Sequence, residues 1–211
     1  MKILVVAGLT DVQPKDNDFE AVVAVDAGAI WALDHDFQPD IVVGDFDSVS
    51  DEEMIRIVES GAEVHKLTPI KDETDLEVAL FLTFENYPDA KVTVIGALGG
   101  RLDHELTNIY LPTTKKFQQF ARQITLENLQ NTVKYLQAGE NKLDRITEKK
   151  YIGFMKVGAE NFSIENAKYP LKAEDNFANI YASNEFISDN MTVKFSSGCV
   201  IVIYSCDVNG K

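Results

Sequence analysis

Several carboxylates occur at positions where they could hold a cation. Asp45 and Asp47 follow the apolar run 40–43, and Asp75 lies in the first turn of a helix expected over 74–84. In an extended segment, Asp45 and Asp47 would point to the same side because they are two residues apart. Hard oxygen ligands gathered from two loops are typical of Mg²⁺, with water and substrate phosphates completing its shell. These residues predict a magnesium site suited to phosphoryl chemistry.

A glycine-rich turn could bind the phosphates themselves. The segment 96–104 reads Gly-Ala-Leu-Gly-Gly-Arg-Leu-Asp-His and links an apolar run to a helix-like run. Such a turn presents backbone N–H groups and a positive dipole end to an anion. Arg101 adds a cation with a planar fork. Asp103 and His104 stand where the helix should begin, and Asp103 could be its N-cap or contact a ribose or a metal-bound water. A tight turn before a capped helix would show the same pattern.

The other carboxylates and the nearby lysine also have structural interpretations. Asp75 and Glu77 would favour any helix N-terminus, and a lone loop lysine such as Lys71 is usually solvated, although it could also reach a phosphate. The pair Asp45 and Asp47 is harder to explain in this way, because two like charges cost stability unless a cation lies between them. The pair therefore favours a metal site.

Length and charge limit the class of protein. The chain has 211 residues and a formal net charge of −14, which allows one large or two small domains and argues against a nucleic-acid surface. Its two cysteines, Cys199 and Cys206, fall on opposite faces of an expected strand, so no disulfide is expected, as suits a reducing compartment. The apolar run 1–7 is too short for a signal sequence, and no window is long enough to span a membrane. We expect a cytoplasmic protein.

Strands and helices alternate over residues 1 to about 112. Apolar runs predict strands over 2–7, 21–25, 40–43, 63–67 and 92–95. Helical spacing predicts helices over 30–33, 50–60 and 74–84, and the last two begin with capping-box patterns, Ser50 with Glu53 and Thr74 with Glu77. This alternation predicts a mostly parallel, doubly wound α/β sheet, which binds ligands at the carboxyl ends of its strands. The residues that follow such ends are Asp26, Asp45, Asp47 and Arg101.

From about residue 122 the pattern becomes all-β. Short β-branched or aromatic runs occur over 123–126, 133–136, 151–157, 161–165, 178–182, 191–195 and 200–204. Turn residues that include Gly139, Gly158 and Gly198 separate them, which predicts a small antiparallel β-sandwich. We expect an α/β domain over 1–125 and a β-sandwich domain over 126–211, without a low-complexity linker between them.

Four ordered segments resemble the thiamine pyrophosphokinase (thiamine diphosphokinase) family. They are Val-Asp-Ala-Gly-Ala at 25–29, Pro-Asp-Ile-Val-Val-Gly-Asp-Phe-Asp-Ser at 39–48, Lys-Asp-Glu-Thr-Asp-Leu-Glu-Val-Ala-Leu at 71–80, and the turn at 96–104 with Asn108. In the second half, Ser-Asn-Glu-Phe at 183–186 resembles the family's Ser-Asn element, and 193–203 resembles its last hairpin. The resemblance covers nearly the whole chain and is weak between 112 and 175.

The resemblance implies an activity and an assembly. The pyrophosphoryl group of ATP would pass to the hydroxyl of thiamine, giving thiamine diphosphate and AMP, with Mg²⁺ as cofactor. The protein would be a homodimer whose active site lies at the cleft between subunits. One subunit would supply the nucleotide and metal residues, and the β-sandwich domain of its partner would help to hold thiamine. ATP and thiamine would be its ligands, without nucleic acid or membrane.

Carried over residue by residue, the resemblance also implies roles for single side chains. Magnesium would be held by Asp45, Asp47 and Asp75. ATP would be held by Asp26, Lys71, Thr74, Arg101, Asp103 and His104. Thiamine would contact Ser183 and Asn184. The catalytic residues would be Asp47, Asp75 and Arg101, with Asp75 a candidate to accept the hydroxyl proton. Two departures stand out: Ala27 replaces a glycine usual in the family, and the only tryptophan, Trp31, is in the first domain.

Two other interpretations stay open. The segment Asp-Phe-Asp-Ser at 45–48 mimics the nucleophile loop of aspartyl phosphatases of the haloacid dehalogenase kind, in which Asp45 would be phosphorylated. That loop normally follows the first strand, and here it follows the third. A non-catalytic regulatory module would bind a nucleotide or cation without turnover.

Overall fold

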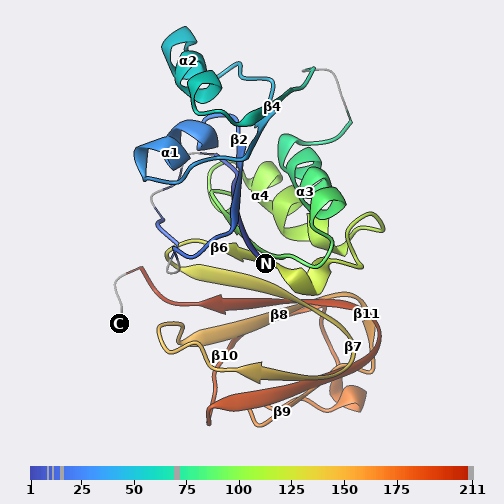
Figure 1. Cartoon of the computed structure of the whole chain (residues 1–211). Helices are drawn as coiled ribbons and strands as arrows, with labels where there is room; N and C mark the ends of the chain where they lie inside the picture. The colour runs from blue at the N-terminus through green and yellow to red at the C-terminus, as the bar shows by residue number, and fades with distance from the viewer. Residues whose placement is uncertain (9, 11, 15–16, 69–71, 209–211) are drawn as a thin grey trace. The chain divides into compact units, whose positions relative to one another are not determined.

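The chain forms two compact units. The computed structural model describes residues 1–8, 10, 12–14, 17–68 and 72–208. Contacts divide the chain into Met1–Leu111 with Leu126–Asn128, here called the α/β unit, and Pro112–Thr125 with Leu129–Lys211, here called the β unit (Figure 1). The sequence analysis expects the domain boundary at residue 125, whereas the first continuous part of the α/β unit ends at Leu111. Residues 126–128 also belong to the α/β unit, and the short strand β6 (Ile124–Glu127) runs into them. In the described ranges, no helix is long and apolar enough to cross a membrane.

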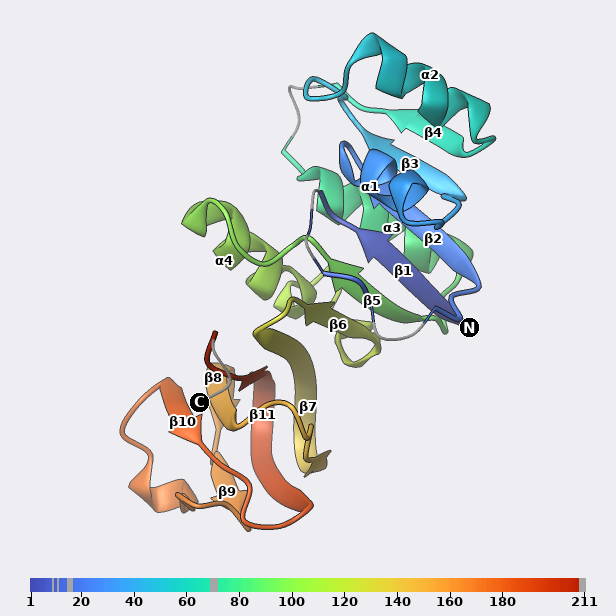
Figure 2. The ribbon, with the colours of Figure 1, turned by 90° about the vertical axis from the view of Figure 1, so that its left-hand side faces the viewer.

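The α/β unit contains five parallel strands in the order β5-β1-β2-β3-β4 (Figure 2). Their bounds are Lys2–Val6 for β1, Ala21–Val25 for β2, Ile41–Gly44 for β3, Glu63–Lys66 for β4 and Lys91–Ile95 for β5. All residues of β2 and β3 are buried, because helices cover both faces of a parallel sheet. The predicted doubly wound sheet is confirmed.

Among the residues that the structure describes, four helices flank this sheet. They are α1 (Gly28–Asp34), α2 (Asp51–Glu59), α3 (Asp75–Asn86) and α4 (Leu102–Tyr110). Trp31 of α1 and Ile57 of α2 are buried in one apolar cluster with residues of β1, β2 and β3. Helix α3 contacts β2 and β3 from the other face, as Figure 1 shows. The expectation that Trp31 belongs to the core is confirmed.

The helix starts follow local side-chain chemistry. Ser50 and Glu53 form the predicted capping box of α2, in which each side chain bonds the other residue's backbone N–H group. Thr74 caps α3, and its Oγ1 accepts from the Glu77 N–H at 3.2 Å. The expectation that Asp103 could be an N-cap is wrong, because α4 begins at Leu102 with Arg101 at the cap position. An aspartate is favourable throughout a first helical turn, so its presence does not identify the cap.

The β unit is an antiparallel β-sandwich, as predicted. Its strands are β7 (Asn131–Asp144), β8 (Tyr151–Glu160), β9 (Ser163–Glu165), β10 (Ile180–Asn184) and β11 (Asn190–Ser205), in the order β10-β8-β11-β7 with β9 beside β11. The start of β11 pairs with β9 and its end pairs with β8, so this long strand takes part in both layers. Aromatic and β-branched side chains, among them Phe154, Phe162 and Val202, fill the core.

The strands β7, β8 and β11 are longer than the sequence predicts, whereas β9 is shorter than the predicted run 161–165. The runs 191–195 and 200–204 belong to the single strand β11, whose register shifts between Phe195 and Cys199. The expected hairpin over 193–203 is therefore wrong. Gly139, Gly158 and Gly198 lie inside strands with positive φ values of 122°, 66° and 73°. Positive φ serves bulges as well as turns, so glycine alone does not separate the two.

The two cysteines are free, as expected. Cys199 lies in β11, and Cys206 follows the end of that strand.

Candidate active site

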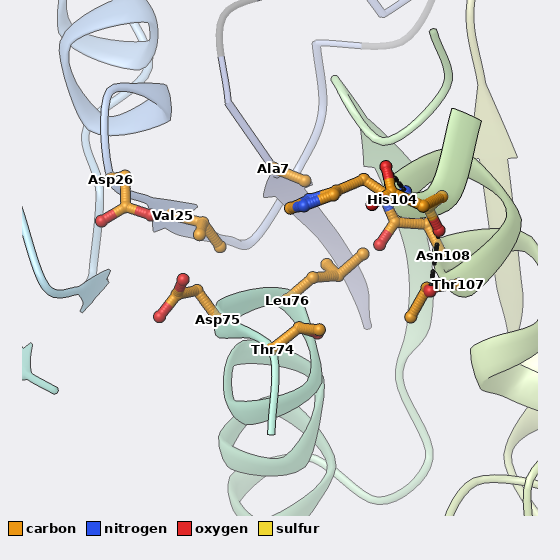
Figure 3. Close-up of a pocket in the computed structure, with 10 residues that line it drawn as sticks. Ala7, Val25, Asp26, Thr74, Asp75, Leu76, His104, Thr107 and Asn108 are labelled. Atoms are coloured by element: carbon orange, nitrogen blue, oxygen red, sulfur yellow. Dashed lines mark hydrogen bonds between the residues drawn. The ribbon is translucent and has the colours of Figure 1, made fainter. Parts of the chain in front are cut away.

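A pocket of about 400 Å³ opens in the α/β unit where β1 and β2 end and α3 and α4 begin (Figure 3). It is lined by Ala7, Val25, Asp26, Thr74, Asp75, Leu76, Asp103, His104, Thr107 and Asn108. The chain order reverses beside β1, whose neighbours are β2 and β5, and open α/β sheets bind ligands at such points. The N-termini of α3 and α4 at the pocket favour an anionic ligand.

Asp26 connects the ends of two strands. It follows β2 in a left-handed conformation with φ 47°, and its Oδ1 accepts a hydrogen bond from the Phe46 N–H at 3.2 Å. Gly44 makes this approach possible, because a Cβ at Gly44 would lie 1.9 Å from Oδ1 of Asp26. The glycine that ends β3 therefore determines where the Asp26 carboxylate can lie.

The charges of three other carboxylates act on Asp26 at this edge of the sheet. Burial and, to a smaller extent, the charges of Asp75, Asp45 and Asp47 raise the pKa of Asp26 to about 6, although the hydrogen bond from Phe46 acts to lower it. Three separate segments contribute these carboxylates: the end of β2, the loop after β3 and the start of α3. A cation among them would relieve the repulsion that this pKa reflects.

The loop that carries Asp45 and Asp47 is a turn, not the extended segment that the sequence analysis considers. Phe46 has φ 60° and is buried in the core, so it reverses the chain and anchors the loop. The Asp47 N–H donates to Oδ1 of Asp45 at 3.1 Å. The side chains of Asp45 and Asp47 therefore need not point to the same side, because the left-handed residue between them breaks the alternation of an extended chain.

The carboxylates fit magnesium that arrives with a nucleotide. Within the described ranges, no group of three or more His, Cys, Asp or Glu side chains could by itself hold a metal ion. Carboxylate oxygens are nevertheless the donors that Mg²⁺ prefers, and Mg²⁺ commonly takes one or two of them together with water and substrate phosphates. The donor set therefore suits an ion shared with a triphosphate.

Helix α4 forms the wall of the pocket that carries the expected ATP-binding residues His104 and Asp103. In Figure 3 the imidazole of His104 points toward the side that bears Asp26 and Asp75. Asn108 donates from Nδ2 to the Ala97 carbonyl at 2.9 Å and so ties the glycine turn to α4.

Arg101 does not line this pocket. Its side chain is 73% exposed and pairs with Asp103, with 2.6 Å between Nη2 and Oδ2 and 3.2 Å between Nε and Oδ1. This pair lowers the pKa of the Asp103 carboxyl and raises that of Arg101. Lys71, the other expected cation, lies outside the described residues.

Thr107 also lines the pocket, although no sequence pattern singled it out above. Its Oγ1 donates to the Asp103 carbonyl at 2.8 Å, one helical turn earlier (Figure 3). The spacing of four residues from Asp103 is the signal that could have identified it, because residues four apart share a helix face.

A second cavity, a groove of about 590 Å³, lies in the β unit. It is lined by Tyr151, Gly153, Phe154, Met155, Tyr169, Ile180, Tyr181, Ala182, Ser183, Glu185, Ile203, Ser205 and Asp207. Three tyrosine rings beside two carboxylates suit a cationic aromatic ligand. Ser183, expected to contact thiamine, lines this groove, whereas Asn184 is 4% exposed and does not.

Comparison with known proteins identifies one family across both units. The family model for the thiamin pyrophosphokinase catalytic domain matches residues 15–126, and the model for the thiamin pyrophosphokinase vitamin B1 binding domain matches residues 140–200. The thiamine pyrophosphokinase of Bacillus subtilis (strain 168) is 32% identical over 189 residues, which cover 88% of this chain and 87% of that protein.

Solved structures agree with these matches. A thiamin pyrophosphokinase family protein from Enterococcus faecalis has 34% sequence identity and a TM-score of 0.92, covering 98% of this chain and 100% of that one. Yeast thiamin pyrophosphokinase shares the fold at 12% identity, with a TM-score of 0.78 over 97% of this chain and 86% of that one.

Proposed function

This chain belongs to the thiamine pyrophosphokinase family and is an ATP-dependent thiamine diphosphokinase, and from that premise we propose how its parts perform the reaction. The α/β unit binds ATP in the pocket at Asp26, and the β unit binds thiamine in the groove at Ser183. The observation that carries this proposal is the pocket that Asp26 and Asp75 line at the starts of α3 and α4, with the charges of Asp45 and Asp47 also acting on Asp26.

The reaction joins the thiamine hydroxyl to two phosphates of ATP. The hydroxyl oxygen bonds the β-phosphorus, the bond from that phosphorus to the oxygen bridging it to the α-phosphorus breaks, and AMP leaves. Asp75 at the start of α3 is our candidate to accept the hydroxyl proton, because its side chain lines the pocket. Asp26, Thr74, Asp103 and His104 contact ATP from the pocket walls, and Lys71 and Arg101 supply cations for its phosphates.

Asp45, Asp47 and Asp75 are the residues that would hold magnesium. When bound, Mg²⁺ neutralises phosphate charge and orients the triphosphate. The loop after β3 contributes two of these carboxylates and α3 contributes one. The loop is anchored through buried Phe46, so its carboxylates are positioned before the nucleotide binds.

We also propose that the protein is a cytoplasmic homodimer whose active sites combine the α/β unit of one subunit with the β unit of its partner. Mixing Asp47→Asn with Tyr169→Ala tests this arrangement. If sites are shared, mixed dimers contain one site that carries neither substitution, and activity returns after subunit exchange. If each subunit holds a whole site, every site keeps one substitution and activity stays at the level of the variants. Light scattering gives the oligomeric state directly.

Turnover with ATP, Mg²⁺ and thiamine tests the proposed activity. We expect AMP and thiamine diphosphate in equal amounts, and a loss of turnover of about a hundredfold or more in Asp47→Asn with the fold unchanged by circular dichroism. Asp89→Asn is the matched control, because Asp89 is an exposed aspartate away from the pocket. Phosphate release from small phosphomonoesters would support the phosphatase alternative, and ligand binding without turnover would support the regulatory module.

A further inference from the structure

The side chain of Asn184 makes three hydrogen bonds inside the β unit. Its Oδ1 accepts from the N–H groups of Tyr169 at 3.1 Å and Glu185 at 2.9 Å, and its Nδ2 donates to the Tyr169 carbonyl at 2.8 Å. At 4% exposure, it has little surface left for a ligand. A carboxamide that pairs with both backbone groups of one residue holds that residue as a neighbouring strand would.

The chain around Asn184 is shaped to direct this side chain inward. Ser183 has φ 60°, and the pairing of β10 with β8 shifts register between Tyr181 and Asn184. A bulge of this kind changes the direction in which the following side chain points. Strained residues held in place by their surroundings are common at functional sites.

Further contacts fix the segment that precedes Tyr169. Lys168 donates its backbone N–H to the Glu185 carbonyl at 3.0 Å, and its Nζ pairs with Oε1 of Glu185 at 2.6 Å. Ala167 forms an isolated antiparallel bridge with Phe186. The segment 167–169 is therefore docked along 184–186, with Asn184 bonded to the residue at its end.

Tyr169 is the residue that this docking presents to the groove. Tyr169 as a whole is 58% exposed and lines the same groove as Tyr151 and Tyr181. The Lys168 Nζ lies 5.6 Å from the centroid of the Tyr169 ring, so the ring face already lies near a cation. Because Glu185 pairs with Lys168, that ammonium contributes little net repulsion toward a second cation. Aromatic faces attract cations, and thiamine carries a cationic thiazolium ring.

We propose that Asn184 is a positioning residue that acts through Tyr169, and that the Tyr169 ring is the surface thiamine contacts. This inference rests on the proposed function. It differs from the direct contact between Asn184 and thiamine that the family resemblance implies. A backbone clamp on Tyr169 would reduce the freedom that its exposed ring loses when the ligand binds.

A double-mutant cycle separates positioning from direct contact. We expect Asn184→Ala and Tyr169→Ala each to raise the KM for thiamine about tenfold, with the KM for ATP unchanged and Tyr169→Phe close to wild type. In the Tyr169→Ala background, adding Asn184→Ala should leave the KM for thiamine unchanged. If the two effects multiply instead, Asn184 contacts thiamine independently and the proposal is wrong.

A control variant and the single variant Tyr169→Ala keep the test decisive. Asn161→Ala is the control, because it removes another asparagine hydrogen bond of the β unit, from Nδ2 to Ser196 Oγ at 2.9 Å, without touching the groove, and should leave the KM for thiamine unchanged. If Asn184→Ala does not fold, an unchanged KM in Tyr169→Ala still overturns the proposal. Absence of turnover in the wild-type protein would instead contradict the proposed function.

Discussion

Among the residues that line the pocket where we propose that ATP binds, Asp26 has the most strongly shifted pKa. Burial and the charges of Asp75, Asp45 and Asp47 raise its pKa to about 6, so the Asp26 carboxyl is partly protonated near neutral pH. A cation among these groups would favour the ionised form of Asp26 and release its proton. Binding of magnesium with a nucleotide should therefore depend on pH in the range where Asp26 titrates.

Stability should also depend on pH through Asp26. Its pKa is about 6 in the native protein and near 3.8 ordinarily, so between about pH 4 and pH 6 the native state binds more protons than the unfolded state. The contribution of Asp26 to stability is then fully present below about pH 4 and is lost as the pH rises through about 6. In EDTA, the thermal midpoint of the wild type should fall relative to Asp26→Asn across this range.

The comparison with Asp26→Asn isolates this residue from the other carboxylates. The asparagine keeps an oxygen that can accept the Phe46 N–H and cannot ionise. An equal difference between wild type and variant at low and neutral pH would show that the pKa of Asp26 is not raised.

Among the secondary-structure elements, the N-caps of α2 and α3 link the local sequence to the site. Ser50 and Thr74 cap α2 and α3 with similar hydrogen bonds to the third helical residue. Thr74 lines the ATP pocket and Ser50 does not. The two caps are therefore a matched pair, alike in their structural role and different in their distance from the chemistry.

We expect Ser50→Ala and Thr74→Ala to lower the free energy of unfolding by similar amounts, about 1 kcal/mol each. Only Thr74→Ala should also raise the KM for ATP, because it alters the start of the helix that faces the nucleotide. Chemical denaturation and steady-state kinetics measure the two effects. An unchanged KM for ATP in Thr74→Ala would remove Thr74 from the nucleotide site.

The caps could be predicted from sequence because both partners of each bond lie within three residues. The bulges at Gly139, Gly158 and Gly198 could not, since a positive-φ glycine fits a turn and a bulge equally well. Pairing with a distant strand decides between them. A Cβ at Gly198, for example, would lie 2.4 Å from the Gly158 carbonyl group, a contact across forty residues of chain.

The same distinction applies to the site residues. Parallel strands deliver their ends to one edge of the sheet, and this rule accounts for Asp26 after β2 and for Asp45 and Asp47 after β3. Asp75 instead comes from the start of α3 and lines the same pocket as Asp26. No such rule predicts where a long side chain points, or where a side chain points when it follows a residue in the left-handed conformation. Arg101 extends into solvent against Asp103, and Asn184 turns inward because of the left-handed Ser183.

In the whole molecule, each unit has its own core and its own cavity. The two family models follow the same division of labour, one for the catalytic half and one for the vitamin-binding half. Each substrate should therefore protect a different set of residues when it binds.

Amide hydrogen exchange can identify the residues that each substrate protects. We expect ATP with Mg²⁺ to slow amide exchange at 74–76 and 103–108, and thiamine alone to slow it at 151–155 and 180–185, because bound ligands suppress local opening. Protection by thiamine confined to the α/β unit would contradict the assignment of the groove.

The fate of the phosphates of ATP tests the central claim most directly. With thiamine, Mg²⁺ and ATP labelled in its β- and γ-phosphates, we predict that both labels appear together in thiamine diphosphate, with one AMP for each product molecule. Asp47→Asn should form both products about a hundredfold more slowly, or more slowly still. Formation of ADP with thiamine monophosphate, or release of free phosphate, would show that the chain does not transfer a pyrophosphoryl group and would contradict the account.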